Sequence, residues 1–264
     1  MNKGKVYCSA DWHGNELGFK VLDFLKPEDT LYFLGDAIDR DIHGIALLDK
    51  LLADPRVIFI KGNHEEMMAE FLRDTLVYHK GQYIDIYDSL LNSHWFRNGG
   101  GYTWEGGLKD KTKEEQLEYC QKINALPLEK IYISPNGHTV ILEHAGYTPS
   151  NHIYRNKKHN SLWDRGHFHD AWEINHDNIY LVHGHTPVQY LKYSYGYESQ
   201  EPMTKEDLKH KYYFNHGKLA EVPTVIRYCD NHKFDIDMCT VATNRIALLD
   251  LDTFETIYFD KGED

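Results

Sequence analysis

The chain has only four cysteines among its 264 residues, and none of them shows the C-x-x-C spacing of a metal or redox motif. It also lacks an apolar run of about 18 residues, so no membrane-spanning helix and no membrane partner are expected. The apolar stretch near the N-terminus is too short for a secretory signal peptide. We therefore expect reduced thiols and a cytoplasmic location.

Basic residues are also scarce: 29 Lys and Arg stand against 41 Asp and Glu, which gives a net charge of −12. A nucleic-acid-binding protein would present a basic face, so no nucleic-acid partner is expected. A phosphate substrate is not excluded, because cations bound by clustered carboxylates reverse the local field. Repeats and linkers are absent, and the length fits a single domain over 1–264. The segment 190–235 has little apolar periodicity and is interpreted as an insertion or a lid.

Strand-like and helix-like segments alternate in the first third of the chain. Strands are predicted at 5–10, 30–34 and 56–60, and helices at 15–25, 44–52 and 65–78. This alternation favours βαβ units and a parallel sheet. Later helices are predicted at 83–91 and 112–126, and strands with shorter connections at 130–134, 139–143, 178–182 and 246–251. The expected fold is α/β (α+β), with two mixed sheets packed face to face and helices outside.

Polar residues directly follow five of the predicted strands, often beside glycine. These groups are Asp11-Trp12-His13, Asp36 with Asp39 and Arg40, Asn63-His64-Glu65, His144, and His183-Gly184-His185. Ligands of open α/β sheets bind at the carboxyl ends of strands. Glycine at such places lets the backbone turn sharply and lets a ligand approach closely.

The spacing within these groups suits a metal site. Asp11 and His13 lie on one face of an extended segment, so both can bind one ion. The Asp36 carboxylate can bridge two ions, because it has two oxygens and about four lone-pair sites. Asn63 adds an amide oxygen, and His144 and His185 add imidazoles. Mixed oxygen and nitrogen ligation suits Mn²⁺, Fe or Zn²⁺ better than Ca²⁺.

Each group by itself has a simpler explanation. Asn63 could be a helix cap after a strand, the Asp11–His13 group and Gly35-Asp36 could be turns, and His144 could be an ordinary buried histidine. Five such groups in this order, each at a strand end, predict a dinuclear metal site instead.

The motifs Asp-x-His-Gly, Gly-Asp-x-x-Asp-Arg, Gly-Asn-His-Glu, His-Ala-Gly and Gly-His-Thr-Pro resemble the signature of the metallophosphoesterase superfamily, and specifically its phosphoprotein phosphatase branch. Segments 95–101, 162–165, 236–238 and 245–253 resemble the short bacterial and phage serine/threonine protein phosphatases, which are related to the symmetrical dinucleoside tetraphosphatases. The resemblance covers nearly the whole chain except about 190–235.

The resemblance implies a four-layer αββα sandwich and two divalent ions, with Mn²⁺ expected first and Fe or Zn²⁺ as alternatives. One ion would lie on Asp11, His13 and Asp36. The second would lie on Asp36, Asn63, His144 and His185. A hydroxide that bridges both metals would attack the phosphorus in one step.

The resemblance also implies that His64 is the general acid and that Asp39 orients it. An imidazole titrates near neutral pH, and a carboxylate partner would hold it charged. Arg40 and Arg165, together with Asn63, would bind the phosphoryl oxygens, since a guanidinium offers a bidentate fork. Taken alone, either arginine could equally form a surface ion pair.

Two positions depart from the pattern of the family. Asp41 stands where the family usually has glycine, which affects the loop near the phosphate. Pro187 stands where nuclease-like relatives carry a second histidine, which points away from that branch. His183, two residues before His185, could approach the metals instead, and its role stays open.

The leading functional interpretation is a serine/threonine protein phosphatase that acts on a phosphorylated protein or a small phosphate ester. The first alternative is a symmetrical dinucleoside tetraphosphate hydrolase, in which aromatic residues among 190–197 would stack an adenine. The second is a non-catalytic scaffold of the same fold. That alternative requires a lost ligand or general acid, and none is missing.

Overall fold

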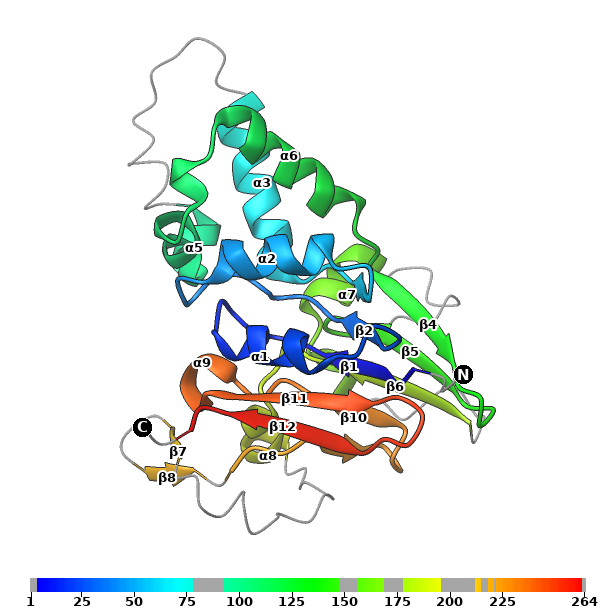
Figure 1. Ribbon diagram of the computed structural model, residues 1–264. Coiled ribbons are helices and arrows are strands. Elements are labelled where there is room, and N and C mark those ends of the chain that lie inside the picture. Colours follow the sequence, from blue (N-terminus) through cyan, green and yellow to red (C-terminus); the bar gives the residue numbers. More distant parts are fainter. Residues whose placement is uncertain are drawn as a thin grey trace.

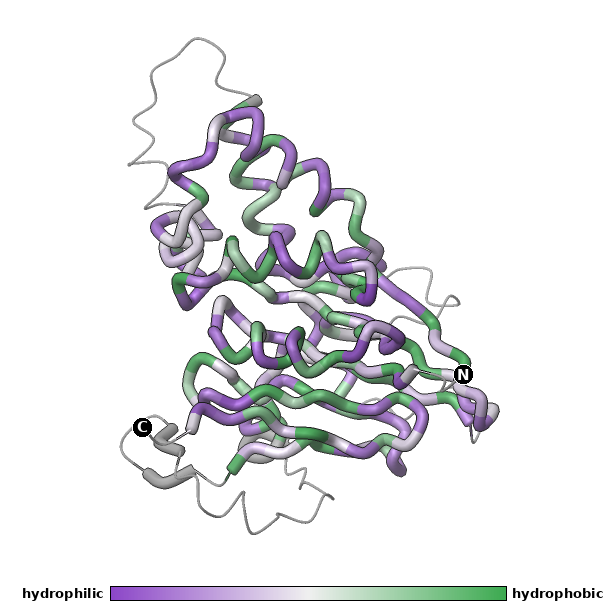
Figure 2. The backbone as a smooth tube through the Cα atoms, in the orientation of Figure 1, coloured by the Kyte–Doolittle hydropathy of each residue, from purple (hydrophilic) through white to green (hydrophobic). Residues whose placement is uncertain are grey.

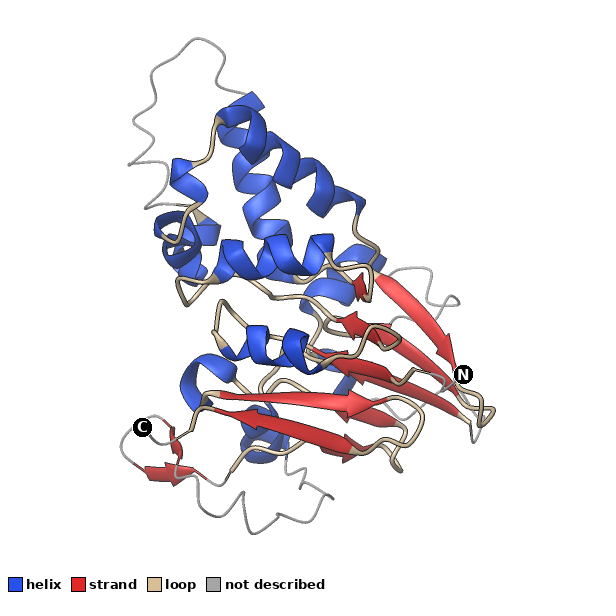
Figure 3. Cartoon of the chain, in the orientation of Figure 1, coloured by secondary structure: helices blue, strands red, loops and turns tan. Residues whose placement is uncertain are grey.

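The computed structural model describes residues 4–77, 93–147, 156–168, 178–195, 212–214, 218–220 and 222–262. Within these residues the strands form two mixed five-stranded sheets flanked by helices, as Figures 1 and 3 show. The predicted fold class is confirmed. The helix predicted at 83–91 lies outside the described residues.

The first sheet has the strand order β12-β11-β1-β2-β3. Its strands are β1 (Val6–Ser9), β2 (Thr30–Phe33), β3 (Val57–Phe59), β11 (Arg245–Asp250) and β12 (Thr256–Asp260). β1, β2 and β3 are parallel, with α1 (Leu17–Phe24) and α2 (Gly44–Ala53) as their connections, as the βαβ prediction required. β11 and β12 add antiparallel partners at the other edge.

The second sheet has the order β4-β5-β6-β10-β9. Its strands are β4 (Glu129–Ile133), β5 (Thr139–Glu143), β6 (Ile179–His183), β9 (Ile226–Tyr228) and β10 (Lys233–Asp235). β5, β6 and β10 run parallel, so their carboxyl ends meet at one edge. β9 and β10 fall within the segment 190–235. A separate hairpin joins β7 (Tyr212–Phe214) to β8 (Lys218–Ala220).

Alternating side chains place a hydrophobic core on each face of the first sheet. On β11, Ile246 and Leu248 pack into the core beneath the helices, while Ala247 and Leu249 pack into the core shared with the second sheet. Tyr7 and Cys8 on β1 divide in the same way. Successive side chains of a strand point to opposite faces, so one sheet supports both cores. Hydrophobic and hydrophilic stretches accordingly alternate along the chain (Figure 2).

Helices α2, α3 (Asn63–Val77), α5 (Gly101–Glu105) and α6 (Lys113–Ala125) gather on one side of the sheets in Figure 1. A capping box of Thr112 and Glu115 begins α6. The remaining helices are α7 (Lys157–Trp163), α8 (Val188–Tyr195) and α9 (Thr240–Thr243), with short turns η1 (Phe96–Gly100), η2 (Leu108–Asp110) and η3 (Gly166–Phe168). Within the described residues, no helix has the length and apolar character needed to cross a membrane.

Arg56 ties the end of α1 to the strand that leads into the site. Its guanidinium donates to the backbone carbonyls of Leu22 and Leu25, at 3.1 and 2.6 Å, and pairs with Asp54. The last carbonyls of a helix have no partner within the helix, so these bonds satisfy otherwise exposed acceptors.

We expect Arg56→Ala to lower the free energy of unfolding by about 1–3 kcal/mol, because two carbonyls and one carboxylate lose their donor. Urea denaturation followed by circular dichroism measures the change. Lys122→Ala is the control: it removes an exposed ion pair with Glu118 on α6, which is worth roughly 0.5 kcal/mol or less. Equal effects of the two substitutions would contradict the role of Arg56.

Candidate metal centre

Backbone strain marks the site. Twelve described non-glycine residues have positive φ, and six of them are predicted site residues: Asp11, His13, Asp36, Asp39, Arg40 and His185. Such conformations are uncommon for residues with a Cβ and persist only where the surrounding structure enforces them. The concentration of strain at the predicted strand ends supports a functional role for these loops.

The loops after β2 and β3 approach each other closely at Gly62. A Cβ on Gly62 would lie 2.2 Å from Asp36 Oδ1, so only glycine fits. Glu65 joins the same loops: its carboxylate accepts from the backbone N–H groups of Asp36, Ala37 and Gly62 at 2.8, 2.8 and 3.0 Å. Burial and the neighbouring Asp36 raise the pKa of Glu65 to about 7, although the three donors favour its ionised form. Glu65 therefore positions the loop that carries Asp36.

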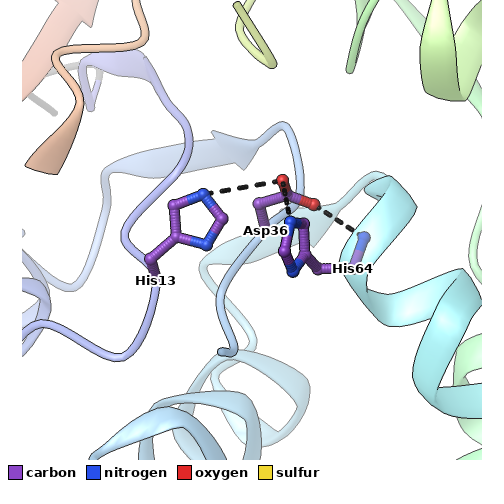
Figure 4. A group of neighbouring side chains, drawn as sticks. All are labelled: His13, Asp36 and His64. Atoms are coloured by element: carbon purple, nitrogen blue, oxygen red, sulfur yellow. Dashed lines mark hydrogen bonds and ion pairs between the residues drawn. The ribbon is translucent and has the colours of Figure 1, made fainter. Parts of the chain in front are cut away.

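The two oxygens of Asp36 face two sets of side chains. Oδ2 lies 3.7 Å from His13 Nε2 and 3.8 Å from His64 Nε2, as Figure 4 shows. Oδ1 lies 3.5 Å from His144 Nε2 and accepts from the backbone N–H of His64 at 3.0 Å. Asp36 is therefore in the position expected of a bridging carboxylate.

The second set of side chains lies around the amide oxygen of Asn63. Its Oδ1 lies 2.8 Å from His144 Nε2 and 3.0 Å from His185 Nδ1. Asp36, His144 and His185 form one of the two groups of described residues whose ligand atoms lie close enough to share an ion, and His13, Asp36 and His64 form the other. All five of these side chains are buried.

Hydrogen bonds at the far side of each ring fix the histidines. His13 Nδ1 contacts the carbonyl of Ile38 at 3.1 Å, and His144 Nδ1 contacts that of Leu34 at 2.8 Å. Both rings therefore turn Nε2 toward Asp36, the arrangement typical of metal-binding histidines. His185 Nε2 is buried and has no hydrogen-bond partner among the described residues.

The ligand atoms fit divalent metal ions. Separations of 2.8–3.5 Å among Asn63 Oδ1, His144 Nε2, His185 Nδ1 and Asp36 Oδ1 match the roughly 3 Å expected between ligands that each lie about 2.1 Å from one ion. Burial lowers the pKa of His144 and of His185, which keeps both imidazoles neutral and able to coordinate. Burial disfavours a charged Asp36, but the surrounding histidines outweigh it and hold its pKa below the usual range.

The carboxylate of Asp11 contacts the backbone beside a predicted ligand. Both of its oxygens accept from the backbone N–H of His185, at 3.2 and 3.1 Å. It lies outside the two groups of ligand atoms, and His64 joins His13 and Asp36 in its place. Burial, Asp237 and Asp36 raise the pKa of Asp11. A role for Asp11 as a metal ligand stays a prediction.

The predicted general acid and its partner are in contact. His64 Nδ1 lies 2.6 Å from Asp39 Oδ2, and both residues are almost fully buried. Burial lowers the pKa of His64, but Asp36 and Asp39 outweigh this effect, so the pKa is raised. The exposed Arg40 reaches inward and places its two terminal nitrogens 2.8 Å from His13 Nε2 and 3.1 Å from His64 Nε2.

Arg165 and His183 differ in their relation to the site. Arg165 is exposed, and its Nε donates to Thr186 Oγ1 at 3.1 Å, one residue after His185. His183 is fully buried and contacts the Tyr228 hydroxyl through Nε2 at 2.6 Å. Its Nδ1 contacts the carbonyl of Gly184 at 3.0 Å. Both ring nitrogens of His183 therefore have partners away from Asn63.

Three further residues near the site have no role in the sequence interpretation. Trp95 and Thr103 both contact the Asp39 carboxylate. Asp237 is buried at the end of β10, where burial raises its pKa to about 6 against the hydrogen bond from Cys239 and the charge of Arg40. The motif resemblance included Trp95 and Asp237 but gave them no function, and no local signal pointed to Thr103.

A sandwich of two mixed sheets, with imidazole and carboxylate ligands converging at the strand ends, is the architecture of a phosphoesterase that uses metal ions. The chain belongs to the calcineurin-like phosphoesterase family, whose model matches residues 4–217. No curated protein gives a significant match to the chain.

Three solved structures share the fold. The first is a protein provisionally described as a diadenosine tetraphosphatase, with a TM-score of 0.55 and 14% identity over 99% of this chain and 96% of that one. The second is a metallophosphoesterase from Sphaerobacter thermophilus, with a TM-score of 0.51 and 12% identity over 99% and 89%. The third is a serine/threonine phosphatase from Saccharomyces cerevisiae with similarity to human phosphatase PP5, with a TM-score of 0.50 and 14% identity over 99% and 81%.

We expect Glu65→Gln to weaken Mn²⁺ binding by about 10–100-fold, because Asp36 loses part of the support that orients it. Unfolding free energy should fall by about 1–3 kcal/mol, since a buried N–H is left facing an amide NH₂. Calorimetric titration with Mn²⁺ and urea denaturation measure the two effects. Glu70→Gln, exposed on the same helix, should change neither. Unchanged Mn²⁺ affinity in Glu65→Gln would contradict the positioning role.

Proposed function

We propose that the protein is a metal-dependent phosphomonoesterase of the serine/threonine protein phosphatase type. The observation that carries the proposal is the position of Asp36, whose two oxygens face the His13 side and the His144 side of the site. Membership of the calcineurin-like phosphoesterase family supports phosphoester hydrolysis as the class of reaction.

In this proposal His13 and Asp36, with Asp11, hold one ion. Asp36, Asn63, His144 and His185 hold the second. Divalent ions bound there would supply a nucleophilic water of lowered pKa and neutralise charge on the phosphoryl group. The protein itself supplies neutral imidazoles and one ionised carboxylate in a buried site, so the ligands need no large rearrangement.

The two arginines bind and orient the phosphoryl group. Arg40 is exposed but bends toward His13 and His64, so its planar fork lies beside the proposed acid and one proposed metal ligand. Thr186, the residue after His185, holds Arg165. Both guanidinium groups can donate hydrogen bonds to phosphoryl oxygens, while the Asn63 amide contributes a further polar contact.

His64 protonates the leaving oxygen. Asp39 holds Nδ1, which leaves Nε2 on the side of Asp36 and Arg40, where the substrate would lie. An imidazole whose pKa is raised carries a proton near neutral pH and can give it to an alkoxide as the phosphorus–oxygen bond breaks. The alkoxide of a serine or threonine side chain is a poor leaving group, so this substrate class needs the acid.

A protein-borne phosphate is favoured by the open rim of the site. Arg40 and Arg165 are exposed, while the residues assigned to chemistry are buried. Solved structures described as a serine/threonine phosphatase and, provisionally, as a diadenosine tetraphosphatase share the fold at 14% identity. Since neither likeness decides the substrate, the dinucleoside alternative is a competing outcome of the test below.

We expect the protein reconstituted with Mn²⁺ to release phosphate from phosphoserine and phosphothreonine peptides. Its kcat/KM for them should exceed that for diadenosine tetraphosphate and for bis(p-nitrophenyl) phosphate by about tenfold or more, because a monoester offers one more non-bridging oxygen, with its negative charge, than a diester or an internal phosphate does. Faster cleavage of diadenosine tetraphosphate into two ADP molecules would overturn the protein phosphatase proposal. No turnover of any of these substrates with Mn²⁺, Fe²⁺ or Zn²⁺ would overturn the enzymatic one.

Metal binding separates the roles of His185 and His183. We expect His185→Ala to lose one of two bound Mn²⁺ ions, since its Nδ1 faces Asn63 and Asp36. His183→Ala should keep both ions, because the partners of its ring are Tyr228 and Gly184. Metal analysis of the folded proteins after gel filtration measures the stoichiometry. Equal metal loss in the two variants would make His183 a ligand.

A further inference from the structure

The Asp39 carboxylate is held from three directions in the buried interior. Trp95 Nε1 donates to its two oxygens at 3.0 and 2.9 Å, and Thr103 Oγ1 donates to Oδ1 at 2.7 Å. His64 Nδ1 contacts Oδ2 at 2.6 Å. None of these four residues is more than 1% exposed.

We propose that Trp95 and Thr103 are positioning residues for proton donation: they fix the Asp39 carboxylate so that it orients His64 toward the leaving oxygen. The inference rests on the proposed function, in which His64 is the acid. Neither residue touches the substrate or the ions in this proposal. Both act through Asp39.

Thr103 fixes Asp39 at two points. Its hydroxyl donates to the Asp39 carboxylate and accepts from the Asp39 backbone N–H at 2.8 Å. Asp39 has a positive φ of 74°, which is a strained conformation for this residue. The double contact therefore stabilises both the unusual backbone of Asp39 and the direction of its side chain.

Trp95 holds both oxygens of the Asp39 carboxylate. Its indole N–H shares Asp39 Oδ2 with His64 Nδ1, so rotation of the carboxylate would break two hydrogen bonds at once. A carboxylate held in this way selects the tautomer and the ring orientation of its histidine. Proton donation from Nε2 requires that orientation, because the acid must lie within hydrogen-bond reach of the leaving oxygen.

The sequence around Trp95 is built for this contact. A Cβ on Gly100 would lie 2.5 Å from the indole ring of Trp95, so a larger residue would displace the ring. The neighbouring Gly99 carbonyl accepts from the Arg40 backbone N–H at 3.2 Å. One segment, 95–103, thus supports two adjacent residues, Asp39 for the proton and Arg40 for the phosphate. These two contacts give Gly99 and Gly100 a role, although neither glycine is among the proposed metal ligands or catalytic residues.

The proposal predicts an effect that depends on the leaving group. Phenolate is a poor leaving group, so phenyl phosphate needs a proton on its leaving oxygen. The 2,4-dinitrophenolate of 2,4-dinitrophenyl phosphate leaves readily without one. We expect Trp95→Phe to lower kcat by about tenfold on phenyl phosphate, because general acid catalysis contributes 10²–10⁴-fold and is here only partly lost. On 2,4-dinitrophenyl phosphate kcat should change by about twofold or less, with KM unchanged on both substrates.

Matched variants separate positioning from folding. Trp104→Phe removes an indole on α5 that packs on Phe71 and Phe96, and it should leave both rates within about twofold of the original. Thr103→Val keeps the shape but removes the hydroxyl, and it should reproduce the selective loss. Thr103→Ser keeps the hydroxyl and should restore the rate on phenyl phosphate. If Trp95→Phe does not fold, the threonine pair carries the test.

A measurement without turnover follows the same contact. In the metal-free protein, the proton between His64 Nδ1 and Asp39 should give a downfield ¹H resonance that His64→Asn removes. Trp95→Phe and Thr103→Val should shift this resonance, and Trp104→Phe should leave it in place. An unmoved resonance in both Trp95→Phe and Thr103→Val would overturn the proposal.

The His64→Asn background distinguishes the possible failures. In that background Trp95→Phe should cause no further loss on phenyl phosphate, because the acid that it positions is gone. A uniform loss on both aryl phosphates, or a further loss in His64→Asn, would overturn the positioning role while the phosphatase activity stands. If the unsubstituted protein with Mn²⁺ hydrolyses neither aryl phosphate, the proposed function itself fails, and this inference fails with it.

Discussion

The site depends on one constraint: the Asp36 carboxylate must stay ionised although it is only 2% exposed. An uncompensated buried charge costs several kcal/mol. The protein offsets this cost with His64, whose pKa is raised, and with the backbone N–H of the same residue at the start of α3. Glu65 then holds the loop that carries Asp36, and Gly62 leaves room for the carboxylate. Residues in the loops after β2 and β3 therefore stabilise or position this one carboxylate.

The strained loops follow from the same requirement. Six site residues have positive φ, and each such conformation costs on the order of 1–3 kcal/mol. Stable elements lie on both sides of the loops, because the first sheet packs into one core with the helices and into another with the second sheet. Rigid strands that end at one edge can therefore hold unfavourable loop conformations in place, which preorganises the ligand atoms at the cost of some stability.

Local patterns predicted the parts of the site that local geometry controls. Asp36, Asn63, His144 and His185 directly follow strands, so the strand pattern alone indicated that they would meet. Other positions depend on contacts between distant segments. Trp95 and Thr103 reach Asp39 from 56 and 64 positions away, and Asp11 turns toward a backbone group 174 positions away. The short elements α8, β9 and β10 were missed for a related reason: they are stabilised by the second sheet and its core more than by periodicity.

Asp39 and Arg40 illustrate why the class of reaction can be predicted from the sequence more readily than the substrate. They are neighbours in sequence, yet Asp39 is fully buried and Arg40 is exposed. The buried side of the site holds the proposed ligands, acid and orienting groups, whose chemistry tolerates few alternatives. The exposed side holds Arg40 and Arg165, where side chains can change without disturbing the core. Strand-end motifs therefore predict the class of reaction, while the motif residues exposed at the surface, such as Arg40, do not by themselves define the rest of the substrate. The half-buried Asp41 and the exposed Ile42 follow Arg40 directly, and they are where a change of substrate preference would leave the chemistry intact.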